Sequence, residues 1–87
     1  MLNFPNASRY YDARQRRVRF WAHDAALEVQ FLVDAAALLH LDPGTGANEA
    51  GLLMTFDLNR PAIEIAAARA YKRHERDSYI LVASDFP

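Results

Sequence analysis

The stretch RVRFWAHDAALEVQFLV, residues 17–33, decides the fold because apolar and polar side chains alternate in two successive parts of it. Side chains along a β-strand point to the two faces of a sheet in turn, so this alternation predicts strands with one buried face. We therefore predict strands at residues 17–23 and 27–33. Their apolar positions are Val18, Phe20 and Ala22 in the first strand and Leu27, Val29, Phe31 and Val33 in the second.

A tight turn at Asp24 and Ala25 would join the two predicted strands as an antiparallel hairpin. The register that follows from this turn places Ala22 opposite Leu27, Phe20 opposite Val29 and Val18 opposite Phe31. Such a register gathers the apolar side chains on one face, which other parts of the chain must then cover.

The remaining patterns predict an arm, three helices and a last strand. Residues 1–15 predict an extended arm and a turn, with a short strand at residues 9–11. Asp34 is a typical N-cap for a helix at residues 35–41, which Pro43 and Gly44 would end. Apolar side chains at helical spacing predict further helices at residues 47–58 and from Pro61 to about residue 74. Both faces of residues 78–84 are apolar, so we expect a strand that is central in the sheet or covered on both sides.

Together these elements predict a single α+β domain that spans residues 1–87. Its expected architecture is a small antiparallel sheet, made of the N-terminal β-hairpin and the C-terminal strand, with about three helices packed on one face. The order of elements is ββαααβ.

Composition limits the class of protein to which the chain belongs. Hydrophobic residues make up 52% of the 87 residues and charged residues 24%, which is typical of a globular domain. The chain has no cysteine, so disulfides and thiolate metal ligands are excluded, and a reducing compartment is favoured. The N-terminus lacks the pattern of a signal peptide, and no apolar stretch approaches the roughly 20 residues of a membrane span. We therefore expect a cytoplasmic protein that makes no membrane contact.

The sequence indicates no catalytic, metal or cofactor site. The three histidines, His23, His40 and His74, lie in different predicted elements and none has a second ligand at metal-binding spacing. His23 and Asp24 at the hairpin tip would form an acid–base pair only if a pocket gathered them, and a turn capped by Asp24 is the simpler interpretation. We therefore predict that the protein is not an enzyme and binds no cofactor.

Basic residues recur at spacings of three and four along the last predicted helix. Because these spacings place side chains on one side of a helix, the four residues form a positive stripe. Two interpretations remain: a solvated face favoured by the helix dipole and diluted by Glu75 and Asp77, or a surface that contacts an anion or nucleic acid. The stripe consists of Arg69, Lys72, Arg73 and Arg76.

The outward face of the predicted hairpin combines an aromatic residue with arginines. In the register above, Trp21 would face Glu28 and Arg19 would face Gln30. Aromatic and arginine side chains are frequent at the centres of protein interfaces and also stack on bases. The alternative is that the N-terminal arm, with Phe4 and Tyr10 or Tyr11, folds over Trp21. The residues of this candidate interface are Arg17, Arg19, Trp21 and His23.

Several short motifs are spread over nearly the whole chain: Leu2-Asn3-Phe4-Pro5-Asn6, Ser8-Arg9, Tyr11-Asp12, Val18-Arg19-Phe20-Trp21, Asp24, Leu27-Glu28-Val29, Asp42-Pro43-Gly44, Phe56-Asp57, Asn59-Arg60, Ile63 and Tyr79. With these motifs the chain resembles small bacterial proteins that are catalogued as a domain of unknown function, number 1488. The resemblance implies a compact α+β domain of the bacterial cytoplasm and carries no known reaction, cofactor or catalytic residue. Where that family commonly has Phe-Trp-Gly-Tyr-Asp at the hairpin turn, this chain has Phe20-Trp21-Ala22-His23-Asp24.

We expect a small cytosolic binding or regulatory module that acts through protein–protein contacts, with a second copy of the chain as one candidate partner. The alternative is a protein that binds nucleic acid or phosphate through the basic stripe. An enzyme that uses His23 and Asp24, or His74, is the third hypothesis.

Overall fold

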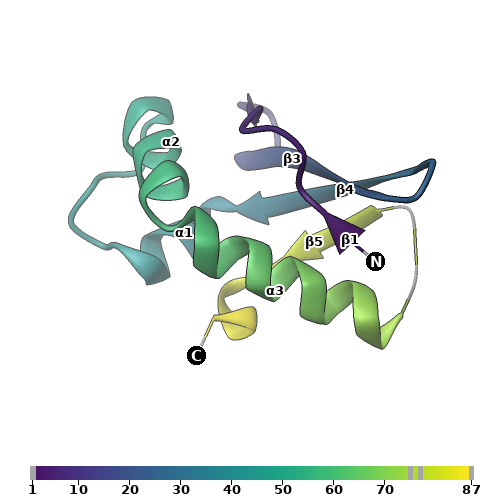
Figure 1. Cartoon of the computed structure of the whole chain (residues 1–87). Coiled ribbons are helices and arrows are strands. Elements are labelled where there is room, and N and C mark those ends of the chain that lie inside the picture. Colours follow the sequence, from purple (N-terminus) through teal and green to yellow (C-terminus); the bar gives the residue numbers. More distant parts are fainter. Residues whose placement is uncertain (1, 75, 77, 87) are drawn as a thin grey trace.

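Strands come first in the chain, then helices, then a last strand, as the computed structural model shows for residues 2–74, 76 and 78–86 (Figure 1). This order confirms the predicted α+β class. The strands are β1 (Leu2–Asn3), β2 (Tyr10–Asp12), β3 (Arg17–Asp24), β4 (Leu27–Asp34) and β5 (Ser78–Leu81). The helices are α1 (Ala35–Leu41), α2 (Glu49–Leu58), α3 (Arg60–Arg73) and a short 3-10 helix, η1 (Ala83–Asp85).

The strands form one sheet in the order β1-β3-β4-β5, and β2 pairs with β3 beside β1. β1 and β2 run antiparallel to β3, and β3 runs antiparallel to β4. β5, in contrast, is parallel to β4, so the prediction of a purely antiparallel sheet was wrong at this strand. The three helices between β4 and β5 provide the long crossover that a parallel pair requires.

The hairpin exists, but its register differs by two residues from the predicted one. Phe20 lies opposite Phe31 and Ala22 opposite Val29, while Leu27 lies opposite Asp24. The strands extend to Asp24 and begin at Leu27, so the turn consists of Ala25 and Ala26, with Ala25 at a φ of 54°. Leu27, predicted to be buried, is 52% exposed at the tip of the hairpin. Sequence alternation fixes which face a residue occupies, whereas the turn fixes the register.

Side-chain caps start α1 and α2. The carboxylate of Asp34 accepts a hydrogen bond from Ala37 N at 2.8 Å, which confirms the predicted N-cap. Asn48 caps α2 in the same way through Gly51 N, so α2 begins two residues later than predicted. Gly51 allows the preceding loop to approach closely, because a Cβ atom there would lie 2.5 Å from the carbonyl oxygen of Thr45.

The start of α3 lies at Arg60, one residue before the predicted Pro61. Proline is tolerated in the first turn of a helix, where its missing N–H has no intrahelical partner. The Arg60 side chain is held by Glu64 at 3.0 Å and lies over the Phe56 ring, so the junction between α2 and α3 is tightly fixed.

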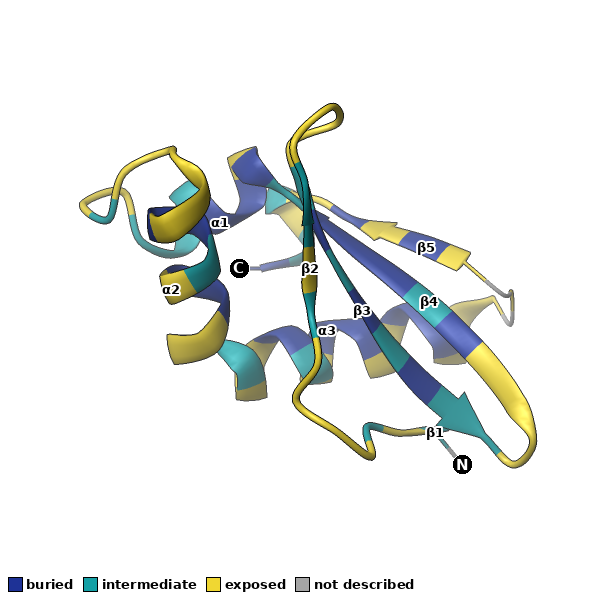
Figure 2. Cartoon of the chain, turned by 90° about the horizontal axis from the view of Figure 1, so that it is seen from above, coloured by how far each residue is buried: buried dark blue, intermediate teal, exposed yellow. Residues whose placement is uncertain are grey.

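One face of the sheet and the three helices share a single apolar core. Phe20, Phe31 and Phe56 are fully buried in it, with the ring centres of Phe20 and Phe31 5.4 Å apart. Tyr79 of β5 stacks on Phe31 at 5.1 Å and so continues the aromatic row to the edge of the sheet. Figure 2 shows the buried residues alternating with more exposed ones along β3 and β5, as a sheet with one covered face requires.

The N-terminal arm is fixed to the helical side of the sheet. Phe4 packs on Phe20 and Phe31, with ring centres 6.1 Å and 6.2 Å apart. Arg9 forms a two-pronged ion pair with Asp57 of α2, and Arg60 donates hydrogen bonds to the carbonyl oxygens of arm residues 6 and 7. The interpretation that the arm covers Trp21 was wrong for Phe4, which lies on the opposite face of the sheet, but Tyr10 of the arm lies on the Trp21 face, opposite Arg19.

β5 is shorter and more exposed than predicted. It ends at Leu81, and residues 83–85 turn into η1 instead of continuing the strand. Tyr79 and Leu81 face the core, whereas Ile80 is 47% exposed. The expectation of a central strand, or one covered on both faces, was wrong because β5 pairs only with β4 among the described residues. The added strand of the arm occurs at Tyr10–Asp12 rather than at residues 9–11, and β1 was not predicted.

Candidate interface on the open face of the sheet

The face of the sheet opposite the core carries aromatic, aliphatic and charged side chains in rows across the strands. The register places Tyr10 of β2, Arg19 of β3, Leu32 of β4 and Ile80 of β5 in one row. The next row contains Trp21, Gln30 and Ser78. We call this surface the open face; it consists of Asn3, Tyr10, Asp12, Arg17, Arg19, Trp21, His23, Glu28, Gln30, Leu32, Asp34, Ser78 and Ile80.

Trp21 is half-buried at the middle of the open face, next to apolar side chains that reach solvent. Tyr10 is 57% exposed and Ile80 is 47% exposed, whereas Leu32 between their strands is buried beneath its neighbours. A hollow of about 780 Å³ lies beside this area, lined among others by Tyr10, Arg19 and Trp21. Exposed apolar surface therefore lies at the two ends of the row next to Trp21, on β2 and on β5.

Arginine side chains lie along the open face instead of extending away from it. The guanidinium carbon of Arg19 is 5.6 Å from the centre of the Tyr10 ring, and Arg19 also lies 3.9 Å from Asp12. The Nε atoms of Arg17 and Arg19 are buried and have no hydrogen-bond partner among the described residues. This arrangement keeps the apolar stems against the sheet while the charged ends reach water.

The two ends of the open face differ in charge. Glu28 stands near the hairpin tip, is 66% exposed through its side chain and lies 4.0 Å from His23. Arg17 and Arg19 lie toward the other end of β3, where Asp12 and Asp34 are the acidic neighbours. All four predicted interface residues, Arg17, Arg19, Trp21 and His23, therefore share one face, although Trp21 faces Gln30 rather than Glu28.

The predicted basic stripe is divided by the end of α3. Arg69, Lys72 and Arg73 are exposed on the helix, but the helix ends at Arg73 and Arg76 lies beyond it. Arg73 forms an ion pair of 3.5 Å with Asp85. The prediction of one continuous stripe on a helix was wrong, because helical spacing was extended past the C-cap at His74.

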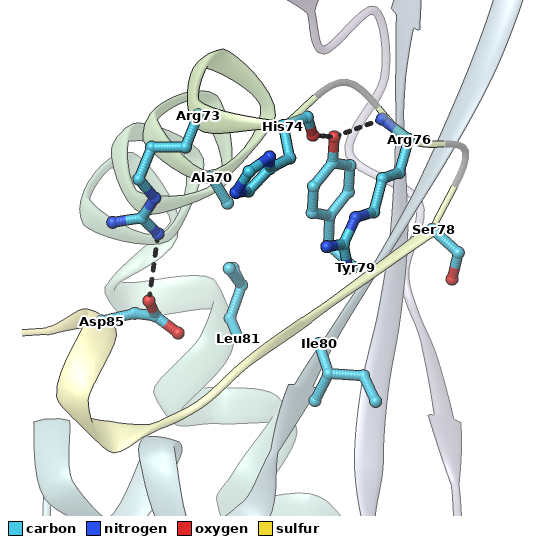
Figure 3. Close-up of a pocket in the computed structure, with 9 residues that line it drawn as sticks. All are labelled: Ala70, Arg73, His74, Arg76, Ser78, Tyr79, Ile80, Leu81 and Asp85. Atoms are coloured by element: carbon cyan, nitrogen blue, oxygen red, sulfur yellow. Dashed lines mark hydrogen bonds and ion pairs between the residues drawn. The ribbon is translucent and has the colours of Figure 1, made fainter.

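A groove that was not predicted from the sequence lies between the end of α3 and β5 (Figure 3). Its volume is about 390 Å³. Arg73, His74 and Arg76 contribute basic groups to its lining, together with Asp85. The remaining lining residues are Ala70, Ser78, Tyr79, Ile80 and Leu81. Two of the four residues of the predicted stripe, Arg73 and Arg76, thus meet here.

The histidines are held by different neighbours. His23 lies near Glu28 on the open face, and a ring nitrogen of His40 lies 2.8 Å from the carbonyl oxygen of Phe86. His74 is the C-cap of α3 and lines the groove. Among residues 2–74, 76 and 78–86, no group of three or more side chains of the types that bind metals could hold a metal ion.

Asp24 does not pair with His23, because neighbouring residues of a strand point to opposite faces. On the core face, the hydroxyl of Tyr71 donates a hydrogen bond of 2.6 Å to the Asp24 carboxylate. This hydrogen bond favours the charged form and lowers the pKa of Asp24. The structure therefore contradicts the alternative of a His23–Asp24 acid–base pair, and Asp24, which we expected to cap the turn, is instead the last residue of β3 and links the tip to α3.

In the part of the chain that the structure describes, no helix is both long enough and apolar enough to cross a membrane. Fold and surface together define a small mixed α+β domain with helices on one face of a sheet and aromatic and arginine side chains on the other. The chain belongs to the family described as "Protein of unknown function (DUF1488)", whose model matches residues 2–82. This match confirms the resemblance found in the sequence. No curated protein and no solved structure matches the chain.

Proposed function

We propose that this protein is a small protein-binding module of the bacterial cytoplasm, that its binding surface is the open face and that its partner is a second copy of the chain. The observation that carries the proposal is the exposed apolar surface in the row next to Trp21, on a sheet face that lies away from the helices. Tyr10 and Ile80 leave about half of their surface in water there. Large exposed side chains on one sheet face, with Trp21 and Arg19 between them, favour an interaction surface.

The composition of the open face favours a protein partner over nucleic acid. Tryptophan, tyrosine and arginine are the residue types that contribute most to binding at the centres of protein interfaces. Acidic side chains alternate with the arginines, since Asp12 lies beside Arg19 and Glu28 beside His23. Phosphate groups would be repelled by these carboxylates, whereas a protein surface of mixed charge would fit them.

The distribution of charge supports a second copy as this partner. A two-fold rotation about the middle of the open face would bring Glu28 of each copy toward the end of the other copy that carries Arg17 and Arg19 together with Asp12 and Asp34, so that Glu28 could pair with the arginines. Strand spacing and rise give the face an area of about 500 Å². Because stable interfaces bury about 800 Å² on each partner, we expect weak, concentration-dependent association.

A role without catalysis is part of the same proposal. The three histidines have different surroundings. His23 lies beside the Glu28 carboxylate, His40 beside the backbone carbonyl of Phe86, and His74 in the lining of the basic groove. The lack of cysteine and the resemblance to bacterial proteins support a reducing bacterial cytoplasm. Binding of nucleic acid or phosphate by the four basic residues has weaker support, because they do not share one helix face.

Sedimentation velocity over a concentration series tests the proposal directly. We expect the wild-type protein to shift from monomer toward dimer as its concentration rises to about 1 mM, consistent with a small interface. The Trp21→Thr variant should remain monomeric at every concentration. Leu58→Ala is the matched control, because Leu58 is 70% exposed on α2, away from the open face, and this variant should associate like the wild type.

A charge exchange locates the interface further. Glu28→Arg should weaken association, and combining it with Arg19→Glu should restore part of it, since unlike charges would again face one another. The protein has one tryptophan, so its fluorescence reports on the open face alone. A wild type that stays monomeric throughout overturns the proposal. Saturable quenching of Trp21 by a single-stranded oligonucleotide, without self-association, would replace it with the nucleic-acid interpretation.

A further inference from the structure

We propose that the edge of β5 and the groove beside it bind an extended acidic peptide segment, which adds to the sheet as a further strand. This site shares Ser78 and Ile80 with the open face, but its main contacts are the rim of the sheet and the side chains that point toward α3. It does not depend on self-association of the chain.

The edge strand β5 is short, with four residues, but it lacks the charged and proline residues that commonly block strand addition. Within the described residues, β5 pairs with β4 alone, and no backbone hydrogen bond joins its other edge to the rest of the chain. In an edge strand, alternate N–H and C=O groups point outward and can pair with another strand. Natural sheets block such edges with lysine, proline, inward-pointing charges or bulges. The segment Ser78–Leu81 contains no charged residue and no proline.

The groove provides room for side chains of an added strand. Ala70, Tyr79 and Leu81 form its apolar part, and its volume of about 390 Å³ is enough for more than one side chain. Because side chains of an added strand alternate between faces, every second one would enter the groove. Peptides bind other domains in this way, with backbone pairing giving affinity and pockets giving specificity.

The groove wall is held in place by Tyr79. Its hydroxyl accepts a hydrogen bond from Arg76 N and donates one to the carbonyl oxygen of His74. These contacts tie the backbone of His74 and that of Arg76 to the Tyr79 side chain in β5. The backbone that carries the basic side chains His74 and Arg76 is therefore held against β5 by hydrogen bonds.

Charge determines the chemistry of the occupant. Arg73 and Arg76 line the groove, and Arg69 and Lys72 are exposed nearby on α3, against one described acidic lining residue, Asp85. Asp85 is already occupied by Arg73 and by Val82 N, to which it lies 2.7 Å away. Glu75 and Asp77 belong to the same stretch of sequence and lie outside the described residues. Carboxylates on the added strand would pair with the arginines.

An acidic peptide fits the edge better than a second copy does. A second copy paired along β5 would bring its own Arg73 and Arg76 toward the same groove, and like charges would oppose each other there. A peptide with alternating apolar and acidic residues satisfies the free backbone groups, the apolar lining and the arginines together.

The test uses fluorescence anisotropy with a fluorescein-labelled heptapeptide of alternating valine and glutamate. We expect saturable binding that weakens about tenfold when Arg73→Ala and Arg76→Ala are combined, the loss that follows from about 1.4 kcal/mol. The matched control combines Arg69→Ala and Lys72→Ala, which removes the same charge from residues outside the groove lining and should change affinity less than threefold. Equal losses in the two double variants would show that only net charge matters and would overturn the proposal.

Two altered peptides test strand addition without changing the protein. A version with proline at its centre keeps the charges but cannot complete backbone pairing, and it should not bind measurably. A version with lysine in place of glutamate should also fail. Undiminished binding of the proline peptide would overturn strand addition. Saturable binding of inorganic phosphate, together with no binding of the valine–glutamate peptide, would overturn it as well.

Amide hydrogen exchange supplies a direct readout at the edge. Exchange at residues 78–81 should slow when the valine–glutamate peptide is bound, because pairing protects the outward N–H groups. The Trp21→Thr variant should bind the peptide as the wild type does, so failure of the open-face proposal would leave this result unaffected. Binding without any protection at residues 78–81 would contradict the proposed site.

Discussion

Phe20 and Trp21 are neighbours in β3, yet they illustrate two different uses of an aromatic side chain. Phe20 is fully buried and touches a cluster of rings, with Phe31 5.4 Å and Phe56 5.2 Å away between ring centres. Trp21 points to the other face, beside Arg19 and Tyr10, and is only half-buried. The core face therefore stabilises the fold, and the open face is free to vary in chemistry without loss of the fold.

The largest expected effect follows from truncation on the core face. Phe20→Ala removes a ring from a closely packed cluster and should lower the free energy of unfolding by about 3–5 kcal/mol. Such a loss is comparable to the whole stability of many small domains. Urea unfolding monitored by circular dichroism measures it. Phe20→Leu, which keeps most of the volume, should lose about 1.5 kcal/mol or less, and equal losses would contradict the packing explanation.

The second effect tests a close approach on the helical side. A Cβ at Gly51 would lie 2.5 Å from Thr45 O and 2.8 Å from Gly46 O, both backbone atoms. Gly51→Ala should therefore cost about 1–3 kcal/mol, although alanine normally favours a helix. Gly44→Ala is the control, because its nearest contact would be an ordinary 3.6 Å. A Gly51→Ala variant more stable than the wild type in thermal unfolding would show that the loop moves aside readily.

The third effect concerns the link between the hairpin tip and α3. The hydrogen bond from the Tyr71 hydroxyl lowers the pKa of Asp24 in the folded protein. This hydrogen bond therefore stabilises the fold at pH values above the ordinary aspartate pKa of about 4. Its contribution is lost as the pH falls through the lower pKa of the folded state. Tyr71→Phe should raise the pKa of Asp24 and reduce stability at pH 7 more than at pH 3. Carboxyl-carbon NMR titration and urea unfolding at both pH values measure these changes. A loss that does not vary with pH would contradict the assignment.

The smallest expected effect is on the open face. Trp21→Thr should lower the free energy of unfolding by about 1 kcal/mol, because threonine suits a strand and part of the indole is already in water. Chemical unfolding of this variant beside Phe20→Ala compares the two faces directly. A loss of several kcal/mol would show that Trp21 contributes to the fold as Phe20 does.

The sequence predicted the two faces of β3 correctly because alternation is a local property. It did not predict the register, since the turn began one residue later than Asp24 suggested, and Ala25 adopts a positive φ that alanine rarely takes. The parallel pairing of β5 depends on contacts with residues about 50 positions away, such as Phe31 with Tyr79. Periodicity carries no information about such contacts.

The candidate surfaces were predictable to different degrees. Arg17, Arg19, Trp21 and His23 share a face because they are spaced by two, and the structure places them so. Extending the same alternation to the arm would have added Tyr10, which lies opposite Arg19. Arg73 and Arg76 were noted only as part of a helical stripe, because the helix end at His74 and the groove beside β5 arise from tertiary packing.

The parallel pairing of β5 also has a consequence for synthesis of the chain. Ser78 is translated 48 residues after Gln30, its neighbour in the sheet. Until that point, the nascent hairpin has a bare β4 edge, and the Phe31 ring lacks the Tyr79 ring that stacks on it. Unpaired strand edges and exposed apolar rings promote association between unfinished chains. The time that a ribosome takes to translate the three helices therefore sets how long each new molecule is vulnerable to aggregation.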